Sequence, residues 1–231
     1  MNSFAGKHIL VVGGSGAFGK EFCNQLIAEG ALVSGTARTS ESSLNLRADL
    51  ASRLILDLEL PQSIEAVAAY VAGQSVPLDG IVLASGLVAF GSILETPQSV
   101  LDRLMTVNFS GQVELVRALL PKLQESASSG RSPFVVSLSG VISETPLPNL
   151  AAYSASKTAI HGYSLAAARE FSRMGIRWLD ARPGHTESGL AGRAIFGVAP
   201  NFGTGKMTSD VVARIVRGII DGEPDLPSKA F

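Results

Sequence analysis

The chain has 231 residues, which is long enough for one α/β domain with a sizeable core. Its formal net charge is −1 and no basic run stands out, which argues against binding nucleic acid or a membrane surface through charge. Cys23 is the only cysteine, so a disulfide within the chain is excluded, and no apolar run approaches the ~20 residues of a membrane helix.

The N-terminal stretch "MNSFAGKHILVVGG" contains one apolar run of strand length, followed by glycines. This is not the pattern of a signal peptide, so we expect a cytoplasmic protein. The run "HILVV" (8–12) is short, continuous and bounded by glycine, which is typical of a buried parallel strand. A helix is predicted from 18 to 29, where Gly30 ends it.

The rest of the chain alternates between short apolar runs and longer segments with helical periodicity. Further strands are predicted at 31–37, 53–58, 79–86, 132–139 and 176–184. Further helices are predicted at 61–72, 97–124, 151–174 and 208–221. This alternation over residues 1–231 predicts a single-domain, doubly wound Rossmann fold of the α/β class. We expect a parallel sheet of six or seven strands, with helices on both faces and ligands at the carboxyl ends of the strands.

A glycine-rich turn, "VVGGSGAFGK", follows the first predicted strand and opens the first helix. Gly14, Gly16 and Gly19 have the G-x-G-x-x-G spacing, and Gly13 precedes them. Such a turn lets the backbone approach a diphosphate and aims a helix N-terminus at its charge. The pattern between a strand and a helix favours a dinucleotide site, although a glycine-rich turn can also be purely structural.

The end of the second predicted strand indicates which dinucleotide is bound. The stretch "SGTARTS" has no acidic residue to hold a ribose hydroxyl, and Arg38 follows directly. A guanidinium can bind a 2′-phosphate through several donors, so NADP(H) is favoured over NAD(H). The alternative is that Arg38 is an ordinary surface arginine. Asp57 could meet the adenine amino group or cap the next helix.

Tyr153 and Lys157 are four residues apart on the helix predicted at 151–174, so they share one face. A free tyrosine titrates near ~10, and a neighbouring ammonium stabilises the phenolate and lowers the pKa. The pair could therefore act as a general acid and base. No His, Cys and Asp residues have the spacing of metal ligands, so no metal is expected.

The motifs together resemble the short-chain dehydrogenase/reductase family over essentially the whole chain. The matching pieces are the glycine turn (13–19), Asp57, Asn108 in "VNFSG", Tyr153 with Lys157, and "RPGHTES" (182–188). The resemblance implies that Tyr153 exchanges a proton with a carbonyl or alcohol, that Lys157 lowers its pKa and binds the nicotinamide ribose, and that Asn108 holds a relay water. It implies a cofactor site made of Gly13, Ser15, Gly16, Ala17, Phe18, Gly19, Arg38, Asp57, Leu58, Ala84, Gly86, Tyr153, Lys157 and Thr186.

The largest departure from the family is Gly140, at the position where the family has a serine that binds the substrate oxygen. Loss of one such contact costs roughly 10²–10³ in rate by analogy with a lost oxyanion donor. Ser139 is the catalytic candidate if a bulge turns it inward, and Ser143 is an alternative. If neither serves, Gly140→Ser is expected to raise activity on simple carbonyls. Val12 also replaces a threonine whose hydroxyl would brace the glycine turn.

The favoured function is hydride transfer between NADP(H) and a carbonyl or secondary alcohol. The alternative is a nucleotide-binding redox sensor or partner-binding protein with little turnover, which Gly140 favours. Residues 189–207 are expected to form a substrate lid whose apolar side chains suit an apolar small molecule. The family resemblance implies a homodimer or homotetramer through the helices at 97–124 and 151–174. No nucleic acid or membrane partner is expected.

Overall fold

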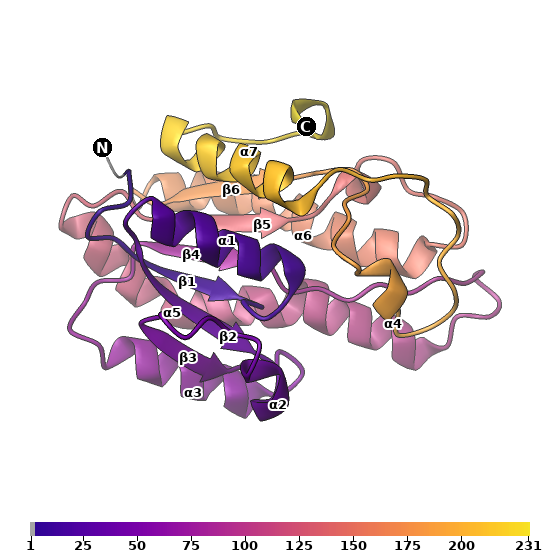
Figure 1. Ribbon diagram of the computed structural model, residues 1–231, viewed down its shortest axis with the longest axis horizontal. Helices are drawn as coiled ribbons and strands as arrows, with labels where there is room; N and C mark the ends of the chain where they lie inside the picture. Colours follow the sequence, from indigo (N-terminus) through magenta and orange to yellow (C-terminus); the bar gives the residue numbers. More distant parts are fainter. Residues whose placement is uncertain (1–2) are drawn as a thin grey trace.

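A computed structural model describes residues 3–231. In this part of the chain, six parallel strands form one sheet in the order β3-β2-β1-β4-β5-β6 (Figure 1). The strands are β1 (His8–Val12), β2 (Leu32–Ala37), β3 (Ser52–Ile55), β4 (Gly80–Leu83), β5 (Phe134–Leu138) and β6 (Arg177–Ala181). The strand order reverses between β1 and β4, and this is the place where doubly wound sheets bind ligands. The predicted fold class is confirmed.

Helices cover both faces of the sheet (Figure 1). They are α1 (Ala17–Ala28), the short α2 (Ser40–Ser43), α3 (Pro61–Ala72), α4 (Gln98–Met105), α5 (Gly111–Ser128), α6 (Ala151–Ser172) and α7 (Thr208–Asp221). Helices α3, α5 and α6 pack on one face, while α1 and α7 pack on the other. The β-α alternation makes each connection a crossover, which places helices on both sides.

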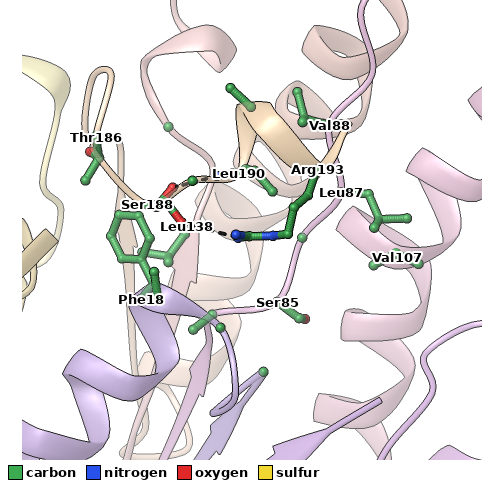
Figure 2. Close-up of a pocket in the computed structure, with 18 of the residues that line it drawn as sticks. Phe18, Ser85, Leu87, Val88, Val107, Leu138, Thr186, Ser188, Leu190 and Arg193 are labelled. Atoms are coloured by element: carbon green, nitrogen blue, oxygen red, sulfur yellow. Dashed lines mark hydrogen bonds between the residues drawn. The ribbon is translucent and has the colours of Figure 1, made fainter. Parts of the chain in front are cut away.

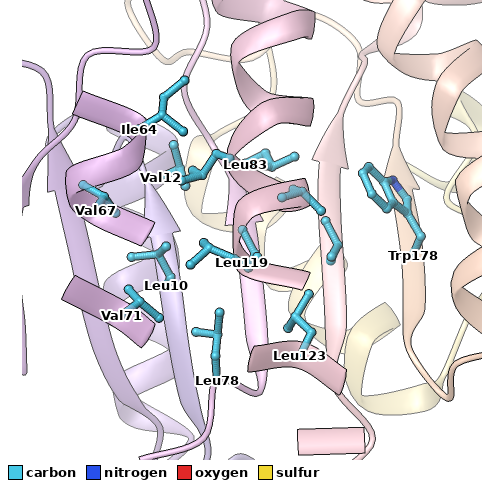
Figure 3. Packing of buried hydrophobic residues seen from close by; sticks show 14 of the residues in the cluster. Leu10, Val12, Ile64, Val67, Val71, Leu78, Leu83, Leu119, Leu123 and Trp178 are labelled. Carbon is cyan, nitrogen blue, oxygen red and sulfur yellow. The ribbon is translucent and has the colours of Figure 1, made fainter. Parts of the chain in front are cut away.

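The two faces of the sheet bury alternate residues of the same strands, because side chains in a strand point to opposite sides. Leu10 and Val12 of β1 face α3 and α5, where Figure 3 shows them packed near Leu119 and Val67. Their neighbours Ile9 and Val11 belong to the opposite cluster, with α1 and α7. The strand "HILVV" is therefore apolar throughout because it is buried on both sides.

The predicted helix at 97–124 is two helices joined by a π-helical turn, Thr106–Ser110. The extra residue in this turn rotates the chain at Asn108, and such turns occur often at functional sites. The predicted strands at 53–58 and 79–86 are too long, because pairing ends at Ile55 and Leu83. Their polar and small ends continue as loops along the edge where the cavity lies.

The C-terminal tail adds no seventh strand within residues 3–231. Leu226 instead forms a single parallel bridge opposite Ala181 of β6. Its amide donates to the carbonyl of Asp180, and its carbonyl accepts from the amide of Arg182. Among the described residues, no helix combines the length and the apolar character required to cross a membrane.

Candidate active site

A cavity of about 960 Å³ runs along the carboxyl ends of the strands, from the glycine turn to the segment after β6. Of the predicted cofactor-site residues, all but Gly19 line it. Gly19 instead packs beneath the turn, where it contacts Gly13. The structure therefore brings the glycine turn, Arg38, Tyr153 and Lys157 onto one cavity, although they are far apart in the sequence.

At two positions of the glycine turn, Gly13 and Gly19, close backbone contacts leave no room for a side chain. Gly13 has φ +81°, and a Cβ there would lie 2.9 Å from the backbone of Ser85. A Cβ on Gly19 would lie only 2.0 Å from the carbonyl oxygen of Gly13. Gly16 lines the cavity and is less crowded. A Cβ there would meet only the carbonyl oxygen of Gly13, at 3.4 Å. The turn therefore fits a diphosphate: it presents bare backbone and the start of α1 to the cavity.

The hydroxyl that Val12 removes has a substitute on the neighbouring strand. The amide of Gly13 donates to Oγ1 of Thr36, a buried residue of β2, at 3.0 Å. Thr36 therefore braces the first residue of the turn from the side. The sequence shows Thr36 near the end of this strand, but its contact with Gly13 depends on the register between β1 and β2.

Arg38 lies on the cavity wall just after β2, and its side chain is exposed. Within the described residues, no carboxylate approaches its guanidinium closely enough for an ion pair. The nearby acid, Glu59, is held by two hydrogen bonds from Arg103, at 2.8 and 3.0 Å. These bonds, and to a smaller degree the charge of Arg38, hold the pKa of Glu59 below its usual value. Arg38 is thus free to bind an anion.

Asp57 supports the loop that follows β3. Its Oδ1 accepts a hydrogen bond from the amide of Glu59 at 2.9 Å, and its own amide donates to Ser63 at 2.9 Å. It does not cap α3, whose N-cap residue is Leu60. Asp57 also lies two residues past the end of β3, and its side chain borders the cavity beside Leu58.

Tyr153 and Lys157 lie one turn apart on α6 and both border the cavity. The Nζ of Lys157 donates to the carbonyl of Leu138 at 2.8 Å and lies 6.0 Å from the centre of the Tyr153 ring. Burial lowers the pKa of Lys157 to about 8 and raises the pKa of Tyr153 to about 12. The pKa of Tyr153 is thus raised, because burial disfavours the phenolate, and not lowered as the sequence analysis expected from the neighbouring ammonium.

Asn108 is fully buried in the π-helical turn and does not border the cavity. Its Oδ1 accepts from the amide of Leu87 at 2.7 Å, and its Nδ2 donates to the carbonyl of Leu87 and to Ser156, both at 2.9 Å. A Cβ on Gly86 would meet Oδ1 of Asn108 at 3.3 Å and Nζ of Lys157 at 3.5 Å. Asn108 therefore fixes the loop after β4 against α6, directly beside Lys157.

Ser139 borders the cavity, but its hydroxyl is bonded to a buried carboxylate behind it. A bulge does form there, because the amides of Ser139 and Gly140 both donate to the carbonyl of Ala181, at 3.1 and 3.2 Å. The Ser139 hydroxyl nevertheless donates to the buried carboxylate of Asp180 at 2.6 Å. Ser139 lines the cavity, but its hydroxyl is engaged by a buried network, so a catalytic role for Ser139 stays a prediction.

Ser143 is not a replacement either, because its hydroxyl donates to the carbonyl of Gly140 at 2.7 Å and it does not line the cavity. Gly140 itself has φ +73° and ψ +163°, a conformation that only glycine adopts without strain. This backbone conformation argues against the expectation that Gly140→Ser raises activity. A serine there would be strained even though its Cβ would meet only the Pro183 carbonyl, at 3.6 Å.

Asp180 belongs to a buried ionic cluster behind the site that the sequence analysis did not identify. Arg182 is 4% exposed and contacts the carboxylates of Asp180, Glu144 and Asp225. His161 of α6 also bonds to Asp180, at 2.8 Å. The cluster connects the C-terminal tail and the loop after β5 to the end of β6, just before Pro183 and Gly184.

The end of the cavity beyond Tyr153 has apolar walls. Val88, Phe90, Ile142 and Leu150 form a small cluster against which Tyr153 and Leu190 pack. Residues 189–207 cover this end, and they are attached by backbone hydrogen bonds from Ile195 to Val88 and from Phe90 to Phe196, both 2.9 Å. His185 borders the cavity beside Phe202, with ring centres 5.2 Å apart. Thr186 borders the cavity as well, and its hydroxyl donates to the carbonyl of Gly184 at 3.0 Å.

Comparisons with known proteins agree with this architecture. A family profile described as short chain dehydrogenase matches residues 7–195. A short-chain dehydrogenase from Streptomyces avermitilis is 28% identical, with a TM-score of 0.83 over 97% of this chain and 89% of that one. A short chain dehydrogenase from Burkholderia cenocepacia in complex with NADP is 18% identical, with a TM-score of 0.82 over 99% of this chain and 90% of that one. The second likeness shows the fold alone.

A fungal relative differs in length from this chain. The short chain dehydrogenase MYCFIDRAFT_6125 of Pseudocercospora fijiensis is 28% identical over 194 residues, which are 80% of this chain and 61% of the relative. The chain thus spans less than two thirds of that protein.

Proposed function

Since the chain belongs to the short chain dehydrogenase family, we propose that it is an NADP(H)-dependent oxidoreductase acting on a carbonyl or secondary alcohol. The observation that supports this best is the single cavity that carries the glycine turn at one end and Tyr153 with Lys157 at the other. A dinucleotide extended between these points would bring its nicotinamide near Tyr153. The bound cofactor would supply the hydride.

The residues of the chain would bind the two reactants and move one proton. Tyr153 would donate the proton of its hydroxyl to the substrate oxygen, and Lys157 would stabilise the phenolate that remains. Lys157 would also bind the nicotinamide ribose, and Asn108 would position Lys157 and the loop beside it. With Gly140 lacking a hydroxyl, the substrate oxygen would be polarised by Tyr153. His185, which borders the same cavity, would be a further hydrogen-bond donor.

Arg38 should decide between the two nicotinamide cofactors. Within residues 3–231 its guanidinium forms no ion pair, and the nearby Glu59 is paired with Arg103. Arg38→Ala should therefore weaken NADPH binding by about tenfold or more and leave NADH nearly unchanged. Titration of both cofactors by tryptophan fluorescence or calorimetry measures this. Equal losses for the two cofactors would show that Arg38 does not read the 2′-phosphate.

The pKa of Lys157 predicts how carbonyl reduction depends on pH. Its pKa lies near 8 because burial disfavours the ammonium, so the positive charge is lost as pH rises through about 8. Tyr153, with a pKa near 12, keeps its proton over the same range. We expect kcat for reduction to fall above about pH 8, measured with saturating NADPH and with its Kd followed in parallel. A kcat that stays level up to about pH 10 would contradict this role of Lys157.

The cavity end favours an apolar substrate, since Val88, Phe90, Ile142 and Leu150 form its wall. The runner-up function, a nucleotide-binding redox sensor with little turnover, is favoured by one observation: the hydroxyls of Ser139 and Ser143, on either side of Gly140, already donate to acceptors within the protein. The retained Tyr153 and Lys157 favour the enzyme. A sensor would bind NADPH tightly but would not oxidise it, whichever carbonyl compound is added.

We also propose that the protein forms a homodimer, or a homotetramer built from such dimers. Helix α6 presents an exposed face that includes Ala155, Gly162 and the half-exposed Leu165. Small side chains on such a face allow close packing of a second copy. The mass measured by light scattering at micromolar concentration should be at least twice that of one chain, and a monomer would contradict the proposal.

A further inference from the structure

The lid carries one arginine that points into the cavity. Arg193 ends a 3-10 turn, Ala191–Arg193, and its side chain lines the cavity. The turn lies between Gly189 and Gly197, whose φ angles of +68° and +69° only glycine adopts readily. Within residues 3–231 no carboxylate forms an ion pair with Arg193. A cation is thus held over the cavity without a counter-charge.

The guanidinium is only weakly held by the protein. Its Nη2 donates to the carbonyl of Ser188 at 3.3 Å, which is long for such a bond. Its Nη1 would lie 3.0 Å from a Cβ on Gly189, so the group rests against the backbone of the lid itself. Figure 2 shows the side chain reaching from the lid toward Ser188 and Leu138, on the side of the pocket where Phe18 of the first turn of α1 lies. A stronger acceptor at this place would displace the Ser188 carbonyl.

The anion expected at this place is a diphosphate. The glycine turn offers neutral backbone there, and α1 contributes no acidic side chain in its first turn. Of the other lysine and arginine side chains lining the cavity, Arg38 lies at the far end and Lys157 is bonded to Leu138. Glu187, the acid closest along the chain, accepts a hydrogen bond from the amide of Gly205 at 2.6 Å. Arg193 is therefore the cation available to the middle of the cavity.

We propose that Arg193 is a lid contact for the diphosphate of the bound dinucleotide, an inference that rests on the proposed function. When the dinucleotide binds, its guanidinium leaves the Ser188 carbonyl and donates to phosphate oxygens instead. These oxygens are charged, so they form stronger hydrogen bonds with the planar guanidinium than a neutral carbonyl does. Because Ile195, two residues on, is bonded to Val88, this contact draws the lid onto the apolar end of the cavity. Nucleotide binding thereby completes the substrate pocket.

The test compares nucleotides that differ in the diphosphate, using calorimetry on the full chain. The probes are NADP⁺, NAD⁺ and 2′-AMP, which has the 2′-phosphate but no diphosphate. Arg193→Gln should weaken NADP⁺ and NAD⁺ by the same factor, about tenfold or more, and leave 2′-AMP unchanged. Arg38→Ala is the matched control with the complementary pattern: it should weaken NADP⁺ and 2′-AMP and leave NAD⁺ unchanged.

Further measurements separate the inference from other roles of Arg193. Arg193→Lys should retain part of the affinity, and the salt dependence of NAD⁺ binding should be shallower in Arg193→Gln than in the wild type. Unchanged binding of both dinucleotides to Arg193→Gln would overturn the inference, whether or not KM for a substrate rises. An equal loss for 2′-AMP would also overturn it. A wild-type protein that binds no dinucleotide would instead refute the proposed function on which the inference rests.

Discussion

Replacing Tyr153 by phenylalanine should reduce turnover by about 10²–10⁴-fold and change dinucleotide affinity little. The substitution removes only the hydroxyl, which forms no hydrogen bond with residues 3–231. The ring would keep its packing against the apolar cluster around Val88, Ile142 and Leu150, so the fold should not suffer. Initial rates of NADPH oxidation and NADPH titrations, made on the same preparation, measure the two effects separately.

Tyr163→Phe is the matched control for this result. Tyr163 lies on the same helix, but it packs edge-on against Phe109 and Trp178 and does not border the cavity. Tyr163→Phe should leave turnover within about twofold of the wild type, because the hydroxyl that it removes lies outside the cavity. Tyr153→Phe with turnover as high as that of Tyr163→Phe would refute Tyr153 as the acid.

Gly19→Ala should have the second largest effect, on both stability and nucleotide binding. The new Cβ would stand 2.0 Å from the carbonyl oxygen of Gly13, so the glycine turn must shift. We expect the free energy of unfolding to fall by roughly 1–3 kcal/mol, the usual cost of overpacking. Dinucleotide affinity should fall by at least about tenfold, because backbone donors to the diphosphate move with the turn.

Gly73→Ala provides the control, because it adds the same methyl group at an exposed helix end. A Cβ there would lie 3.5 Å from the carbonyl of Ala69, which is ordinary contact, and the φ of −74° suits alanine. Denaturant unfolding and NADPH titration should show the wild-type behaviour for Gly73→Ala. If Gly19→Ala bound NADPH as tightly as this control, the turn would not be the diphosphate site.

The overall fold could be predicted from the sequence because central strands such as β1 and β4 are buried on both sides and read as short apolar runs, whereas the helices between strands show helical periodicity. The run at His8–Val12 and the helix at Pro61–Ala72 were predicted with the bounds that the structure has. The prediction for 97–124 missed the π-helical turn at Asn108, since one extra residue in a turn leaves the apolar periodicity nearly unchanged. The positions of Arg38, Tyr153 and Lys157 on one cavity follow from the strand order, which the alternation predicts.

Several details of the site depend on the direction of single side chains, which periodicity does not encode. Ser139 was expected to turn toward the substrate, and its partner Asp180 lies 41 residues away on β6. Thr36 supports Gly13 only because β2 pairs with β1 in one register. Gly140 was interpreted as a lost serine, but its positive φ makes it a requirement of the backbone at the bulge.

The most direct test of the proposed activity is a screen of NADPH oxidation against carbonyl compounds with apolar substituents, run in parallel with wild-type protein and Tyr153→Phe. NADPH binding is measured first for both proteins, so that a negative screen can be interpreted. We predict that both proteins bind NADPH and that only the wild type oxidises it when a suitable carbonyl compound is added. Tight NADPH binding with no oxidation by the wild type across the panel, or equal oxidation by both proteins, would contradict the assignment of Tyr153 as the proton donor of a carbonyl reductase.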